Sequence, residues 1–218
     1  MKKQKKTKDV VNRHTGESWV YSKIVKSHFF KPRNLLLKNP KKNEFSTEGM
    51  VGSPACGDVM RMWLNIDKER DYITKCRWRT LGCASAIAAT SMLSVMITEK
   101  GGMKTENAMK ITPHDILNRL GGLPDRKIHC SVLGDKALRM ALNAWFKKTG
   151  QYERVIVEGT RIIDQDTKVT EADIEEAVLE GARTVADVQK RTKVGIGNPG
   201  CLVEVEQLTR FYSEKYFG

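Results

Sequence analysis

The sequence predicts an α+β protein in which a small antiparallel sheet packs with helices and a mainly helical segment follows. A β-rich run at residues 59–66 and a clean alternation of side chains at residues 73–81 indicate two strands. The polar stretch at residues 67–71 between them is short enough for a hairpin turn. Apolar residues at helical spacing before and after this hairpin indicate the helices.

The N-terminal residues divide into a tail, a helix and a loop. Residues 1–16 are rich in lysine and nearly free of large apolar side chains, so we expect a disordered basic tail. Apolar residues at helical spacing predict a helix over residues 19–30, and Pro32 breaks it. The polar residues 38–48 predict a loop.

Capping signals place several of the later helices. Thr112 is suited to an N-cap and Pro113 to the first turn of a helix that Gly121 ends. Thr170 and Asp173 have the spacing of a capping box, with Asp in place of Glu. The helices after the hairpin are predicted at residues 84–100, 112–120, 135–148, 170–179, 184–190 and 202–216.

The net charge of +12 is distributed unevenly along the 218 residues. Residues 1–16, 17–150 and 151–218 carry net charges of +5, +11 and −4. We therefore expect a domain over residues 17–150, a linker at 151–160 and a second domain at 161–218. A basic body is one signature of nucleic-acid binding, but these cations are dispersed and no nucleic-acid-binding motif accompanies them. We expect no nucleic-acid partner, and salt-sensitive binding would test that third hypothesis.

The compartment is inferred from the cysteines and from the apolar runs. Five cysteines are an odd number in a chain with a sizeable core, which favours reduced thiols over a disulfide framework. No apolar run approaches the roughly 18 residues of a membrane span. No apolar stretch follows the charged N-terminus, so no secretory signal is indicated. We expect a cytoplasmic protein with no membrane contact.

Three segments carry the residues suited to metal chemistry. Cys56 and Asp58 lie in a loop before a strand, Cys83 joins a strand to a helix, and His129 and Cys130 precede a helix. A helix N-terminus favours the thiolate form of Cys83, and thiolates suit iron–sulfur clusters and zinc. The residues alone leave open that Cys83 and Cys130 are small buried apolar residues. Cys76, in the middle of a strand, is expected in the core.

These segments, at residues 49–58 (GMVGSPACGD), 80–88 (TLGCASAIA) and 127–131 (KIHCS), resemble the NifU/IscU family of iron–sulfur cluster scaffold proteins. The resemblance covers about residues 19–148 and includes HFFKPRN at 28–34. It implies a small antiparallel sheet packed by helices. It also implies a cysteine desulfurase that delivers sulfur, iron binding, and transfer of a transient 2Fe–2S or 4Fe–4S cluster to apo-proteins. Such a protein is a binding and transfer scaffold and not a turnover enzyme.

The resemblance assigns a role to each candidate ligand. Cys56, Cys83 and Cys130 match the three site cysteines, and His129 matches the site histidine. Asp58 matches the aspartate that keeps the cluster labile, and Cys130 is the expected first persulfide acceptor. Zinc is a second metal expected at the empty site. The alternative function is a zinc-binding regulator of the desulfurase that builds no cluster.

Two regions depart from the family pattern. Residues 123–127 (LPDRK) stand where many members carry a Leu-Pro-Pro-Val-Lys chaperone motif, so we do not expect a dedicated chaperone. Residues 161–218 resemble a bacterioferritin-associated-ferredoxin-like domain, whose four cluster cysteines correspond here to Asp164, Asp166, Asn198 and Cys201. Carboxylate and amide oxygens do not suit a redox cluster, so we expect this domain to bind none. Its negative charge suggests docking to a partner or to a second copy in a homodimer.

Overall fold

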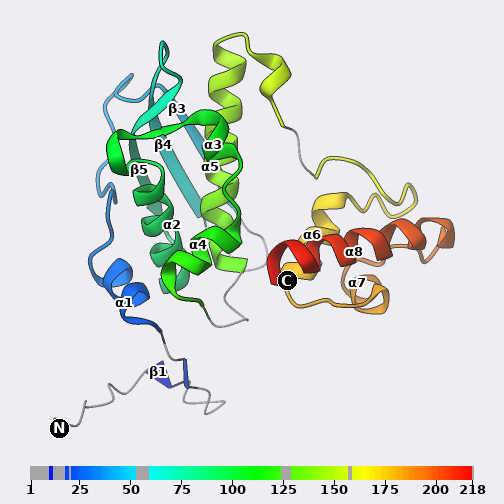
Figure 1. Ribbon diagram of the computed structural model, residues 1–218. Helices are drawn as coiled ribbons and strands as arrows, with labels where there is room; N and C mark the ends of the chain where they lie inside the picture. The colour runs from blue at the N-terminus through cyan, green and yellow to red at the C-terminus, as the bar shows by residue number, and fades with distance from the viewer. Residues whose placement is uncertain are drawn as a thin grey trace, which may run out of the picture.

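The structure is a computed structural model that describes residues 10–11, 18–19, 21–52, 59–123, 129–156 and 159–217 (Figure 1). The strands are β1 (Val10–Val11), β2 (Ser18–Trp19), β3 (Thr47–Gly52), β4 (Val59–Asp67), β5 (Tyr72–Thr80) and β6 (Met103–Lys104). The α-helices are α1 (Lys23–Phe30), α2 (Ala84–Met96), α3 (Thr105–Met109), α4 (Pro113–Leu120), α5 (His129–Lys148), α6 (Glu171–Leu179), α7 (Val185–Thr192) and α8 (Leu202–Phe217). None of these described helices combines the length and the apolar composition that crossing a membrane requires.

The larger sheet is antiparallel, with strand order β3-β4-β5-β6, and helices α2, α4 and α5 lie on one of its faces (Figure 1). Several side chains directed toward these helices are fully buried, namely Met60, Met62 and Leu64 on β4 and Trp78 on β5. The predicted hairpin turn follows Asp67, where β4 ends. The α+β prediction, a small antiparallel sheet packed by helices, is confirmed.

Two predicted helix boundaries are wrong for local reasons. The first helix begins at Lys23 and not near residue 19, because the Ser22 side chain accepts the Val25 N–H at 3.1 Å and caps the helix. Residues 18–19 instead pair with Val10–Val11, within the predicted tail. Helix α2 ends at Met96, and Lys100 has a φ of 54°, which a right-handed helix cannot continue through.

Glycines explain two further differences from prediction. Strand β3 was not predicted, and its first two residues fall in the loop predicted at residues 38–48. Gly49 lets α5 pack closely on this strand, since a Cβ there would lie 2.4 Å from the Ala137 carbonyl oxygen. Helix α5 begins at His129, six residues before the predicted start at Asp135. Gly134 lowers the intrinsic helix propensity of this stretch. Its missing side chain allows contact with α2, because a Cβ there would lie 2.8 Å from Thr90 Oγ1.

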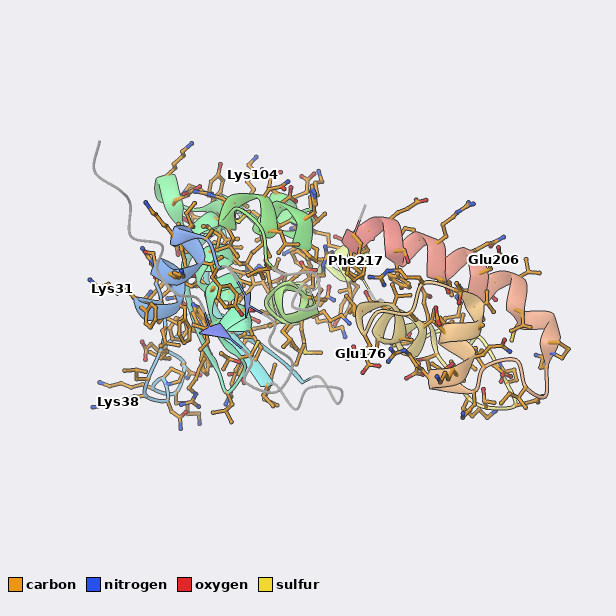
Figure 2. The ribbon with its side chains drawn as sticks, turned by 90° about the horizontal axis from the view of Figure 1, so that it is seen from below. Lys31, Lys38, Lys104, Glu176, Glu206 and Phe217 are labelled. Atoms are coloured by element: carbon orange, nitrogen blue, oxygen red, sulfur yellow. The ribbon has the colours of Figure 1, made fainter. Side chains whose placement is uncertain are left out.

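The C-terminal helices α6, α7 and α8 have an apolar core of their own. Helix α6 begins with the predicted capping box of Thr170 and Asp173, and α7 begins with a second one of Thr184 and Asp187. Figure 2 shows these helices beside the N-terminal part, which carries the labelled Lys31, Lys38 and Lys104, whereas Glu176 and Glu206 lie on the C-terminal helices. The buried residues of this core are Ile163, Val169, Ile174, Ala177, Ala182, Val188, Val194, Cys201 and Val205.

Helix α1 packs on α2 through a buried histidine. His28 is 7% exposed, and its Nδ1 lies 2.8 Å from Ser91 Oγ. The Ser91 hydroxyl oxygen also accepts the Arg33 N–H at 2.8 Å. Burial, with the nearby cations of Arg33 and Arg119, lowers the pKa of His28 to about 4. The imidazole is therefore neutral at pH 7.

This buried imidazole predicts an acid-sensitive fold. The pKa of His28 is 6.5 when unperturbed and about 4 in the fold, so the unfolded chain binds the proton more tightly. Stability contributed by neutral His28 is present above pH 6.5 and is lost as the pH falls toward 4. We expect the urea midpoint of His28→Asn to fall less over this window than that of the parent. His114→Asn, at an exposed position on α4, is the control. Equal pH slopes for the parent and His28→Asn would contradict this role.

Candidate functional site

Strands β3, β4 and β5 bring two of the predicted site segments to one end of the sheet. Gly52, the last residue of β3, pairs with Val59, the first residue of β4. Thr80, the last residue of β5, pairs with the neighbouring Met60, and the Leu81 N–H donates to the Val59 carbonyl at 3.3 Å. The loop between β3 and β4, which contains two predicted ligands, and the connection from β5 to α2 therefore start from the same edge.

Helix α5 brings the third segment to this edge. The Lys148 ammonium donates to the Ser46 carbonyl at 3.0 Å, and the Thr47 hydroxyl donates to the Ala141 carbonyl at 2.8 Å. Since Gly49 then faces Ala137, α5 runs antiparallel to β3. Eight residues of helix span about 12 Å and three residues of strand about 10 Å. The start of α5 therefore lies level with the end of β3.

Cys83 is the N-cap residue of α2, with φ −69° and ψ 170°. The turn before it is held by Thr80, whose hydroxyl donates to the Val59 carbonyl at 2.6 Å and accepts the Gly82 N–H at 2.9 Å. The Cys83 side chain is partly exposed, and its position confirms the prediction of a cysteine at a helix N-terminus. Because α2 and α5 both begin at this edge, the positive ends of two helix dipoles favour thiolates and other anions there.

The structure describes three of the five predicted ligands, and only one of them with its side chain. It gives the position of Cys83, and it places His129 and Cys130 in the first turn of α5, not in a loop before a helix as the sequence suggested. Their side chains, together with Cys56 and Asp58, lie outside the described residues. Among the described residues no group of three or more His, Cys, Asp or Glu side chains could hold a metal ion. The shared ligand set of all five residues thus stays a prediction.

Cys76 lies apart from this edge and confirms its predicted place in the core. It pairs with Leu64 near the middle of the β4–β5 ladder and is fully buried. Burial raises the pKa of its thiol to about 12, so the thiol is protonated and unsuited to metal binding at pH 7.

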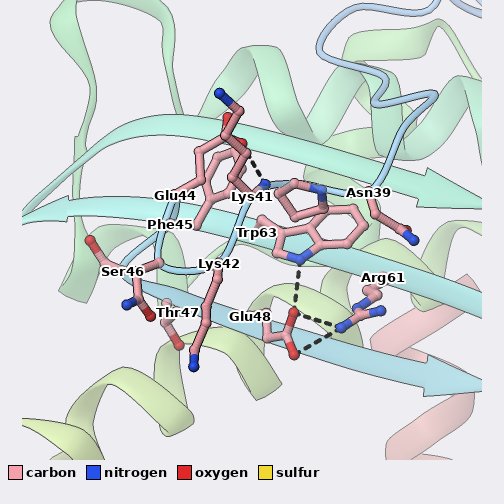
Figure 3. Close-up of a pocket in the computed structure, with 12 residues that line it drawn as sticks. Asn39, Lys41, Lys42, Glu44, Phe45, Ser46, Thr47, Glu48, Arg61 and Trp63 are labelled. Atoms are coloured by element: carbon pink, nitrogen blue, oxygen red, sulfur yellow. Dashed lines mark hydrogen bonds and ion pairs between the residues drawn. The ribbon is translucent and has the colours of Figure 1, made fainter.

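A hollow of about 480 Å³ lies on the sheet face turned away from the helices (Figure 3). Residues 39–48 surround it together with Arg61 and Trp63. The Glu48 carboxylate accepts from the Arg61 guanidinium at 2.9 Å and from Trp63 Nε1 at 2.8 Å. The lining contains no cysteine or histidine, so this hollow is not the predicted metal site.

Comparisons with known proteins identify the family. The sequence profile of the NifU-like N terminal domain family matches residues 20–152. The chain belongs to this family. The NifU nitrogen fixation protein of Azotobacter chroococcum is 35% identical over 87% of this chain and 59% of that protein. The IscU iron–sulfur cluster assembly scaffold protein of Aquifex aeolicus is 38% identical over 62% of this chain and 82% of that protein.

The NifU-like chain spans part of the length of the NifU relatives that it matches. It spans 59% of the Azotobacter NifU protein and 65% of the Nostoc NifU protein, which is 33% identical over 90% of this chain. A solved N-terminal domain of a NifU-like protein from Brucella abortus is 14% identical with a TM-score of 0.44, covering 58% of this chain and 94% of that one. The family assignment rests on the sequence matches.

A second profile, of the BFD-like 2Fe–2S binding domain, matches residues 167–210 of the NifU-like chain. The donor set here does not fit such a cluster. Asp164 is fully buried, and its carboxylate accepts the Gly195 N–H at 2.8 Å, the Asp166 N–H at 3.0 Å and the Thr167 hydroxyl at 2.8 Å. These hydrogen bonds, the Gly195 N–H first, lower the pKa of Asp164. The carboxylate thus links the loop of residues 164–167 to the backbone at Gly195.

The one remaining thiol is also engaged. Cys201 is 8% exposed and donates to the Asn198 carbonyl oxygen at 3.1 Å. Burial, and after it the charge of Asp164, raises the pKa of Cys201, whereas a cluster ligand must be a thiolate. The resemblance assigns cluster cysteines to Asp164, Asp166, Asn198 and Cys201, of which the first two precede the matched residues. These positions offer one protonated thiol among oxygen donors, and that donor set does not fit a 2Fe–2S cluster.

This donor set predicts where cluster absorbance will arise. After iron and sulfide reconstitution of the full chain, Cys56→Ala/Cys83→Ala/Cys130→Ala should show no 2Fe–2S absorbance. Adding Asp164→Cys, Asp166→Cys and Asn198→Cys to that variant should produce it, because native Cys201 then completes four thiols on loops the fold already joins. A 2Fe–2S spectrum in the triple alanine variant alone would show that the C-terminal segment binds a cluster and that this prediction is wrong.

Proposed function

We propose that this NifU-like protein is a scaffold for iron–sulfur cluster assembly. It receives sulfur from a cysteine desulfurase, binds iron, and passes a 2Fe–2S cluster to apo-proteins. One structural observation carries the proposal, namely that the loop after Gly52, the turn at Cys83 and the first turn of α5 start from one edge of the sheet. The names of the NifU and IscU relatives support the same function.

Each proposed ligand has a chemical role. Cys56, Cys83 and Cys130 supply soft thiolates for iron, and His129 supplies an imidazole. Asp58 supplies a hard oxygen, which binds a cluster less firmly and favours its release. Cys130 attacks the outer sulfur of the desulfurase persulfide, so the S–S bond breaks, Cys130 becomes the persulfide and the desulfurase thiolate leaves.

The organisation of the chain is part of the proposal. Residues 17–150 form the scaffold domain, residues 151–160 the linker and residues 161–218 a second domain without a cluster. Two separate apolar cores, one on each side of the linker, support this division. The protein is a cytoplasmic binding and transfer protein, and iron and sulfide are its cargo.

The cysteines predict a simple loss of function. With desulfurase, cysteine and ferrous iron under anaerobic conditions, the parent should develop visible cluster absorbance and pass it to an apo-ferredoxin. Cys56→Ala, Cys83→Ala and Cys130→Ala should each lower the yield by at least about tenfold, since each removes a direct ligand. Cys201→Ala, in the C-terminal core, is the control. Zinc uptake without visible absorbance in the parent would favour the regulator function instead.

The aspartate predicts the opposite effect. Asp58→Ala should make the assembled cluster persist several-fold longer, because the hard ligand that favours release is gone. The measurement is the rate at which absorbance moves to the apo-ferredoxin. Faster cluster loss in Asp58→Ala than in the parent would contradict this role.

A further inference from the structure

The first two turns of helix α5 contact the C-terminal helices. Val132 is 2% exposed, and it belongs to an apolar cluster separate from the two larger cores. Its partners come from α6 and α8 and are Val178, Leu179, Tyr212 and Tyr216, which with Glu175 we call the α5-docking surface. Figure 1 shows the end of α8 beside α4 and the start of α5.

The C-terminal helices and α2 contact different faces of α5. Gly134 follows Val132 by two positions, which is a rotation of about 200° around a helix with 3.6 residues per turn. Gly134 packs on Thr90 of α2, whereas Val132 belongs to the cluster with α6 and α8. The C-terminal helices therefore contact a face of α5 that α2 leaves uncovered.

An ion pair between a buried carboxylate and a partly exposed lysine fixes the contact. Glu175 on α6 is 4% exposed, and its carboxylate lies 2.9 Å from the Lys136 ammonium on α5. The same carboxylate accepts the Tyr216 hydroxyl and lies 3.7 Å from the Lys215 ammonium. Burial opposes the charge, but Lys136 and Tyr216 outweigh it and keep the pKa of Glu175 below its usual range. A charge buried at this depth requires its partner, so it specifies where α6 sits on α5.

The C-terminal segment supplies this surface without a metal. The Asp164 carboxylate links its own loop to Gly195 by hydrogen bonds. The Arg183 guanidinium lies 3.8 Å from the Phe217 ring centroid and holds the end of α8 to the turn before α7. The docking surface is therefore formed by ordinary packing and hydrogen bonds, independent of iron or redox state.

We propose that the C-terminal segment is a metal-free support that holds the first two turns of α5 in place through the α5-docking surface. Glu175 and Lys136 are positioning residues for His129 and Cys130. The support itself is a property of the apo-protein, and only its consequence for His129 and Cys130 rests on the proposed scaffold function.

Hydrogen exchange of the full-length apo-protein, read by mass spectrometry, tests the support. Glu175→Gln removes the charge but keeps a partner for the Tyr216 hydroxyl, and Lys136→Met removes the cation from the α5 side. Both should speed exchange of the amides at 133–137 by at least about tenfold, because Glu175→Gln breaks the ion pair between α6 and α5, and Lys136→Met leaves the buried Glu175 carboxylate with only the more distant Lys215 ammonium. Glu206→Gln, on an exposed part of α8, should leave these amides unchanged.

Two readouts separate the possible outcomes. The exchange rate of amides 188–192 in α7 reports whether the C-terminal core stays folded. If Glu175→Gln also speeds exchange in α7, that variant has disturbed the core, and the result for Lys136→Met then decides the test. Unchanged exchange at 133–137 in Lys136→Met would overturn the support. Absence of cluster absorbance in the parent, with faster exchange in both variants, would instead reject the scaffold function and leave the support intact.

Discussion

Close backbone contact between β3 and α5 at Gly49 determines where the site lies. A side chain on Gly49 would meet the Ala137 carbonyl at 2.4 Å and the Ala141 amide nitrogen at 2.5 Å, so only glycine allows this approach. The small side chains of Ala137 and Ala141, both fully buried, serve the same approach from α5. With α5 seated and antiparallel to β3, its first turn reaches the edge at which β3 ends. The position of His129 and Cys130 follows from packing about two turns away.

Local signals in the sequence were sufficient where one residue decides the structure. Thr112 and Thr170 cap their helices as expected, since a threonine hydroxyl accepts an amide N–H three residues later. The alternation in β5 placed Cys76 in the core. Prediction failed where the cause is distant in sequence. Strand β3 exists because β4 pairs with it, and α5 begins early because Gly134 packs on α2.

For the candidate site, too, the local chemistry could be predicted from the sequence and the arrangement in space could not. Residue chemistry and the family resemblance predicted which side chains matter, and neither requires knowledge of the fold. The common edge could not be read from spacing, because 27 positions separate Cys56 from Cys83 and 47 separate Cys83 from Cys130. Strand register and the direction of α5 supply that information. Both are set by contacts between residues far apart in the chain.

The charge difference between the two halves contributes less to their contact than the sequence suggests. Many acidic side chains of the C-terminal segment pair within it, as Glu180 does with Arg191 and Glu204 with Arg161. Pairs as exposed as these contribute little, because water screens their charges. The contact with α5 instead buries Val132 among apolar side chains and a single carboxylate with Lys136. Apolar burial supplies the affinity of such a contact. The pair of Glu175 and Lys136 fixes the position of α6 on α5, because a displaced Glu175 would be a buried charge without this partner.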